Sequence, residues 1–223
     1  GTIWGAREEF ISSPHLDDMQ CAFATLKGFL KGYHEKSVNV YACFDNEEVG
    51  SVTKQGAGST FLYDVLRRIN SGLGKTEEDY YRAVSESFMV SADNAHAVHP
   101  NHPQKTDVEN CVYMNEGIVI KSHAGQKYTS DAVSIAIFRN ICKQAGVPVQ
   151  FFANRSDEAG GSTLGNISSA QVSLNAVDIG LPQLAMHSAY ETAGIKDTEY
   201  MVQAMKTFFE SHICMENGQI IWS

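Results

Sequence analysis

The sequence predicts an α/β fold of three layers, in which helices cover both faces of a largely parallel, mixed sheet. Short apolar runs of five to seven residues alternate with longer segments whose apolar residues recur every three or four positions. The short runs are typical of buried strands, and the longer segments of helices with one apolar face. Strands that alternate with helices favour parallel pairing, because each helix carries the chain back across the sheet.

Five strands and three helices are predicted from these patterns. The strands span residues 38–44, 87–92, 117–121, 147–152 and 176–181. The helices span residues 16–33, 131–145 and 198–213. In sheets of this kind, ligands bind beyond the carboxyl ends of the strands, so polar residues that directly follow the apolar runs are candidates for a functional site.

The composition excludes several classes of protein. The 223 residues are enough for one α/β domain with a full core, so residues 1–223 are interpreted as a single domain. A net charge of -9 argues against a nucleic-acid partner, because phosphate binding needs clustered Lys and Arg. No apolar run approaches the roughly 20 residues of a membrane helix, and no signal peptide is recognised, so no membrane partner is expected. The five scattered cysteines are interpreted as reduced thiols, and a cytoplasmic location is expected.

An acidic segment, Asp45-Asn46-Glu47-Glu48, directly follows the apolar run 38–44. Adjacent carboxylates beside a buried strand are costly, because ionised groups resist desolvation. A divalent metal would compensate their charge and give them different roles. One carboxylate would bind the metal while the other takes a proton from the attacking water. Asp93 and His187 also follow apolar runs and are grouped into the same site.

Each of these candidates has a structural alternative. Asp17 begins a helix, where a carboxylate either favours the helix dipole or bridges two metal ions through its two oxygens. Asp93 could cap a turn, and His187 could be an ordinary core or surface histidine. Glu47 and Glu48 could both be solvated surface acids.

Two further motifs lie between these positions. Three histidines, His96, His99 and His102, are spaced regularly, but the intervening prolines exclude a helix that would present all three together. His96 is interpreted as functional and the other two as structural. The glycine-rich run 160–165 lacks the lysine of a phosphate-binding loop, so it is interpreted as a turn that lets a substrate approach the backbone.

Taken together, six motifs resemble the M18 family of metallopeptidases, the aspartyl aminopeptidases. In chain order they are SPHLDD, DNEEVGS, SADNAHAVHPN, KSHAGQKYTSDAVS, SDEAGGSTLG and LPQLAMHS. The resemblance covers nearly the whole chain from about Ser13 onward. It implies a zinc-exopeptidase-like fold and identifies the chain with the C-terminal part of the family's catalytic domain.

The resemblance implies an aminopeptidase with two zinc ions that removes N-terminal residues, often Asp or Glu, from peptides with a free N-terminus. The implied metal ligands are Asp17, as a bridge, with Glu48, Asp93 and His187. Glu47 would be the general base. The implied substrate-binding residues are His96, Lys121, Tyr128 and Gly161, and Lys121 would pair with an acidic side chain. The same ligands would also hold cobalt or manganese, so the native metal stays open.

The chain departs from the family's pattern in one important respect. Family members carry an upstream catalytic segment with another zinc-binding histidine and an inserted dimerisation domain, and neither is in this sequence. An incomplete domain is therefore expected, with an exposed sheet edge or apolar patch, weak binding at one metal site and low activity of the chain alone. The full-length protein is expected to be a homo-oligomer. Tyr190 also stands where many relatives have Arg.

Two other functions stay open at this stage. The missing histidine and domain would suit a truncated, inactive relative that acts as a peptide-binding or assembly module. A dinuclear hydrolase that acts on a non-peptide amide would use the same metal ligands.

Overall fold

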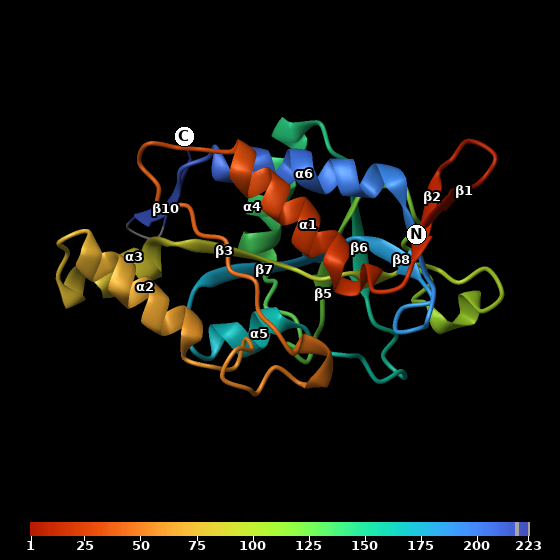
Figure 1. Cartoon of the computed structure of the whole chain (residues 1–223), viewed down its shortest axis with the longest axis horizontal. Helices are drawn as coiled ribbons and strands as arrows, with labels where there is room; N and C mark the ends of the chain where they lie inside the picture. Colours follow the sequence, from red (N-terminus) through yellow and green to blue (C-terminus); the bar gives the residue numbers. More distant parts are fainter. Residues whose placement is uncertain (217–218, 223) are drawn as a thin grey trace.

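A computed structural model of the chain describes residues 1–216 and 219–222 (Figure 1). The central sheet has the strand order β3-β7-β5-β6. Its strands are β3 (Phe88–Ala92), β5 (Ile118–Ser122), β6 (Val149–Ala153) and β7 (Asn175–Gly180). β3 pairs with β7, and β5 with β6, in parallel, whereas β5 and β7 are antiparallel. The predicted mixed α/β fold is confirmed, together with four of the five predicted strands.

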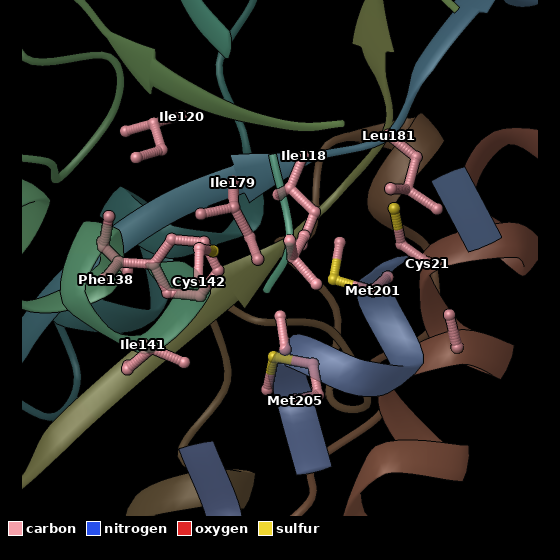
Figure 2. Close-up of a cluster of buried hydrophobic side chains, with 14 of the residues drawn as sticks. Cys21, Ile118, Ile120, Phe138, Ile141, Cys142, Ile179, Leu181, Met201 and Met205 are labelled. Carbon is pink, nitrogen blue, oxygen red and sulfur yellow. The ribbon is translucent and has the colours of Figure 1, made fainter. Parts of the chain in front are cut away.

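Three helices cover one face of this sheet (Figure 1). They are α1 (Leu16–Lys31), α4 (Ala132–Ala145) and α6 (Ile195–Phe209). Figure 2 shows the buried core between helices and sheet, which contains Ile118, Phe138 and Met201. The three predicted helices are confirmed, although α6 starts before residue 198 and ends before residue 213, where the chain enters β10 (Ile213–Glu216).

The opposite face of the sheet carries the short helix α5 (Leu164–Ser169). Gly165 of this helix lies against the side chains of Ser91 and Asp178, which are paired residues of β3 and β7. Side chains alternate across a strand, so Asp178 points away from its neighbour Val177, which belongs to the helix-covered core. α5 therefore belongs to the third layer that the sequence predicts.

A second sheet, with the order β1-β2-β9-β8-β4, packs beside the central one and was not predicted. Its strands are β1 (Thr2–Trp4), β2 (Phe10–Ser13), β4 (Ala95–His96), β8 (Pro182–Leu184) and β9 (Glu191–Gly194). Ser13 at the end of β2 pairs with Glu191 at the start of β9, so the chain that enters α1 runs beside the β8–β9 hairpin. The remaining elements are β11 (Gln219–Trp222), which pairs with β10, and the 3-10 helices η1 (Glu47–Val49) and η2 (Pro103–Lys105).

The predicted strand at residues 38–44 is wrong, because this segment forms no strand. A cavity of about 630 Å³ is lined by residues 38–44, by β3, and by two helices that were not predicted, α2 (Phe61–Gly72) and α3 (Glu77–Glu86). An apolar run becomes a strand only beside a hydrogen-bonding neighbour at about 4.8 Å. β3 ends the described sheet at this side.

The outward face of α1 carries exposed apolar side chains. Its side chains at Met19, Phe23 and Leu30 are 66%, 52% and 69% exposed. The opposite face of the same helix buries Cys21 and Ala24 in the core. None of the helices in residues 1–216 and 219–222 combines the length and the hydropathy needed to cross a bilayer.

Helices α1 and α6 pack closely because α1 carries a glycine at the crossing. A methyl group on Gly28 would overlap the side chain of Met205 and lie 3.0 Å from the backbone nitrogen of Lys206. Gly28 is itself buried. The absence of a side chain at this position therefore sets the distance between the two helices.

We expect Gly28→Ala to lower the free energy of unfolding by about 1–3 kcal/mol, because the helices must separate to admit the methyl group. Chemical denaturation followed by circular dichroism measures this loss. Gly72→Ala at the end of α2 is a matched control, since an added Cβ there meets nothing within 4 Å. The control should be neutral or slightly stabilising, and an equal loss in both variants would contradict the proposed packing.

A buried carboxylate connects the start of α6 to the turn before β5. Asp197 is fully buried and accepts the N–H groups of Asn115 at 2.5 Å and Gly117 at 3.0 Å. Both of these residues have a positive φ, at 67° and 113°. Burial raises the pKa of Asp197 to about 7, although the two N–H donors oppose the shift.

This shift predicts a pH dependence of stability. The pKa is raised above its ordinary value of 3.8, so the folded chain keeps a proton that the unfolded chain releases. The resulting stabilisation is complete below about pH 4 and is lost as the pH rises through about 7. Between about pH 5 and pH 8, the free energy of unfolding of the wild type should therefore fall relative to that of Asp197→Asn. Urea denaturation at both pH values measures the difference, and a constant difference would contradict the assignment.

Candidate metal centre

Several segments that lie far apart in the chain bring acidic residues and one histidine together beyond the carboxyl end of β3. The contributing residues are Asp17 at the start of α1, Glu47 and Glu48 in η1, Asp93 directly after β3, and His187 in the loop between β8 and β9. The structure thus groups the residues that the sequence predicts as metal ligands and general base.

Asp17, Glu48 and His187 form what we call the first cluster. Each offers one ligand atom, and these atoms lie within 4.8 Å of one another. His187 Nε2 lies 3.1 Å from Asp17 Oδ2 and 3.0 Å from Glu48 Oε2. Two carboxylate oxygens and one imidazole nitrogen are the donors of a zinc site that keeps one position open for water or substrate.

Asp17, Asp18 and Asp93 form the second cluster, with ligand atoms again within 4.8 Å of one another. The N–H of Asn94 donates to Asp18 Oδ1 at 3.2 Å, and Lys121 Nζ lies 3.3 Å from Asp93 Oδ2. All three donors of this cluster are carboxylate oxygens. Asp17 belongs to both clusters, which is the position that a bridging carboxylate would occupy.

The carboxylates of the two clusters cannot all be ionised at low cost. Burial, followed by the charges of Asp93 and Glu48, raises the pKa of Asp17 to about 8. Burial and the charge of Asp93 also raise the pKa of Asp18. The same causes raise the pKa of Glu47 to about 7. A cation between these groups would reverse the effect, because an opposite charge favours the ionised form.

One oxygen of Asp17, the residue that the two clusters share, indicates that a cation fits here. Asp17 Oδ1 is buried and has no hydrogen-bond partner among the described residues. A buried carboxylate oxygen without a partner is unfavourable, and a divalent cation would satisfy it. The donors therefore fit two cations that share Asp17. The first cluster suits zinc, and the all-oxygen second cluster also suits manganese.

The turn that carries the two glutamates is formed by residues that tolerate left-handed backbone. Asn46 has a φ of 61° and Gly50 a φ of 103°, on either side of η1. The N–H of Ser51 donates to the carbonyl oxygen of Asn46 at 2.9 Å and closes the turn. Glu48 thereby joins the first cluster. Glu47 is outside both clusters but lies close enough for the charges of Asp93 and Glu48 to act on it.

Lys121 is buried beside Asp93. Its Nζ donates to the carbonyl oxygen of Asn94 at 2.7 Å and lies 5.6 Å from the ring centroid of Tyr128. Burial alone would lower the pKa of Lys121, but the charge of Asp93 and smaller contributions from other neighbours together outweigh it and raise the pKa. The ammonium group is therefore charged, and its nearest acidic partner is a candidate metal ligand.

Two of the other candidates for substrate binding, His96 and Tyr128, interact with Lys121. His96 is exposed at the end of β4, and partial desolvation together with the charges of Lys121 and His187 lowers its pKa. A Cβ added to Gly161 would meet no atom within 4 Å, so the backbone there borders open space. His99 and His102 have ring centroids 5.2 Å apart and belong to neither cluster.

Two residues of the centre were not predicted from the sequence. Asp18 joins the second cluster, and its position next to Asp17 was the only available signal. Glu191 is 2% exposed, and its carboxylate accepts the N–H groups of Asp17 at 2.9 Å and His187 at 2.8 Å. The bond to Asp17 spans 174 residues, so no local pattern could reveal it.

The comparisons with known proteins agree with the motifs. The model of the aminopeptidase I zinc metalloprotease family, M18, matches residues 1–209. A probable M18 family aminopeptidase 2 from Clostridium acetobutylicum is 50% identical over 209 residues, which are 94% of this chain and 48% of the relative. Aspartyl aminopeptidase 1 from Schizosaccharomyces pombe is 39% identical over 225 residues, with shares of 98% and 47%. The chain thus spans about half the length of the curated relatives it matches.

The fold is also similar to that of solved structures. The mApe1 dodecamer of S. cerevisiae superposes with a TM-score of 0.78 and 29% sequence identity, covering 94% of this chain and 48% of that one. The family match, the identities and the shared fold lead to one conclusion, which the resemblance of the motifs predicts: the chain belongs to the M18 family of metallopeptidases.

Proposed function

We propose that the chain carries the catalytic centre of an aminopeptidase that uses two zinc ions to remove N-terminal residues from peptides. The observation that supports this most strongly is the pair of ligand clusters that share Asp17, with Glu47 beside them. Membership of a family described as zinc metalloproteases supports the same reaction.

Two divalent cations in these clusters would supply positive charge that polarises the peptide carbonyl and makes a water molecule easier to deprotonate. Glu47 accepts the proton of the attacking water and returns it to the amine that leaves. Glu47 belongs to neither ligand cluster, so its carboxyl group is free to act as the base in the first transfer and as the acid in the second. The carboxylates of Glu48 and Asp93 hold the cations in place.

A preference for Asp or Glu at the substrate's N-terminus is the finer part of the proposal. The name of the S. pombe relative, an aspartyl aminopeptidase, supports it. The two basic side chains nearest the centre, Lys121 and His96, would receive the acidic side chain. A substrate carboxylate would share the ammonium group of Lys121 with Asp93, with Tyr128 and the backbone of Gly161 bordering the pocket.

The full-length protein is proposed to be a homo-oligomer, in line with the dodecamer described for the yeast relative. One observation favours the alternative function of a peptide-binding or assembly module. No imidazole is part of the second cluster in the described residues, so its affinity for zinc would be lower than that of the first cluster.

Metal binding should stabilise the fold. A ligand at about one hundred times its Kd adds roughly 2.7 kcal/mol to the free energy of unfolding, so saturating zinc should raise Tm by several degrees and EDTA should reverse the rise. Asp17→Asn should abolish most of this rise, because Asp17 belongs to both clusters. Glu35→Gln, an exposed acid outside both clusters, is the matched control and should keep it. A zinc-independent Tm in the wild type would contradict the proposed centre.

Glu47 and Glu48 should give different phenotypes although they are neighbours. Glu47→Gln should lower turnover by roughly 10²–10⁴ while zinc stays bound, because it removes the base and no ligand. Glu48→Gln should weaken zinc binding itself. Hydrolysis of peptides that begin with Asp, Glu or Leu, measured beside the zinc content of each variant, distinguishes the two roles.

Full activity of Glu47→Gln would show that the base is assigned wrongly. If the zinc-loaded wild type turned over none of these peptides, the result would favour the peptide-binding or assembly role instead.

A further inference from the structure

The carboxylate of Glu191 is hydrogen-bonded to the backbone of two residues of the first cluster, Asp17 and His187. It accepts the backbone N–H of Asp17 with Oε2 at 2.9 Å and the backbone N–H of His187 with Oε1 at 2.8 Å. Each oxygen therefore serves one candidate ligand. Glu191 itself is 2% exposed, so neither bond competes strongly with water.

The two backbone segments that Glu191 bonds are the loop between β8 and β9 and the start of α1, and the bonded residue in each lacks helical backbone angles. Ala185 and His187 have positive φ angles of 57° and 66°, a conformation that is unfavourable for a residue with a Cβ. On the other side, β2 ends at Ser13 opposite Glu191, and the chain then turns into α1. The hairpin loop and the start of α1 come from distant parts of the sequence, and Glu191 is hydrogen-bonded to both.

We propose that Glu191 is a positioning residue that fixes the separation of Asp17 and His187 and thereby sets the affinity of the first cluster for a divalent cation. The proposal rests on the metal centre of the proposed function. Asp17 Oδ2 and His187 Nε2 lie 3.1 Å apart, close enough for both atoms to bind one cation with little rearrangement of the side chains. Groups that orient the ligands of a metal typically contribute 10- to 100-fold to its affinity.

A purely structural role for Glu191 would have a different consequence, and the chain offers a close control for it. Asp197 is also fully buried and also accepts two backbone N–H groups, from Asn115 and Gly117. It contacts none of the candidate ligands. Replacing either carboxyl group with an amide should destabilise the fold, because the amide N–H₂ faces a backbone N–H donor, but only the change at Glu191 should affect the cation.

The test uses Co²⁺, which reports its ligand geometry through its visible absorption. The purified wild type, Glu191→Gln, Glu191→Asp and Asp197→Asn would be titrated with Co²⁺ against a chelating dye, and Tm would be measured without metal. Glu191→Gln places an amide N–H₂ against one of the two N–H donors. Glu191→Asp keeps the charge but shortens the side chain by one methylene, so it remains informative if the first variant folds poorly.

We expect both Glu191 variants to raise the Kd for Co²⁺ at least about tenfold and to alter the absorption spectrum. Asp197→Asn should keep the wild-type Kd and spectrum despite a lower Tm. Wild-type Kd and spectrum in the Glu191 variants would overturn the proposal, and so would an equal loss of affinity in Asp197→Asn. If the wild type bound no Co²⁺, the proposed metal centre would fail and this inference with it.

Discussion

The arrangement of this molecule depends on the cost of burying several carboxylates together. Asp17, Asp18 and Asp93 offer oxygens within 4.8 Å of one another, and burial with mutual repulsion raises the pKa of Asp17 to about 8. A fold keeps such a group only where another interaction compensates. Lys121 supplies part of that compensation beside Asp93, and the backbone N–H of Asn94 supplies more at Asp18.

The acidic residues and the histidine of the centre are positioned by two different sheets. The central sheet delivers Asp93 at the end of β3, where strand direction alone fixes its position. The smaller sheet delivers Asp17 and His187 through the pairing of β2 with β9 and the hairpin before β9. The centre therefore lies where the two sheets meet, and the packing of α1 on α6 fixes the start of α1 relative to the core.

The sequence correctly predicts the strands and helices whose pattern of apolar residues follows directly from the burial of those residues. β5 and β7 are apolar in consecutive positions because both faces of each strand are covered, and their prediction is correct. Residues 38–44 show a similar pattern but pair with no strand. The spacing of apolar residues cannot show whether a neighbouring strand is present. The capping box of Thr76 and Asp79 at the start of α3 was a usable signal that was overlooked. Glu191 could not be predicted, because its partners are brought to it only by the pairing of β2 with β9.

The segment that leads to Glu47 and Glu48 is the least supported part of the centre. Residues 38–44 border a cavity of about 630 Å³ instead of a neighbouring strand, whereas Asp93 and Asp17 follow strands that are paired. Local opening begins where backbone hydrogen bonds and apolar contacts are fewest. On warming, the two glutamates would leave their positions while the sheets remain intact. Loss of the proposed metal centre's geometry would then be a local and reversible event that occurs below the temperature of global unfolding.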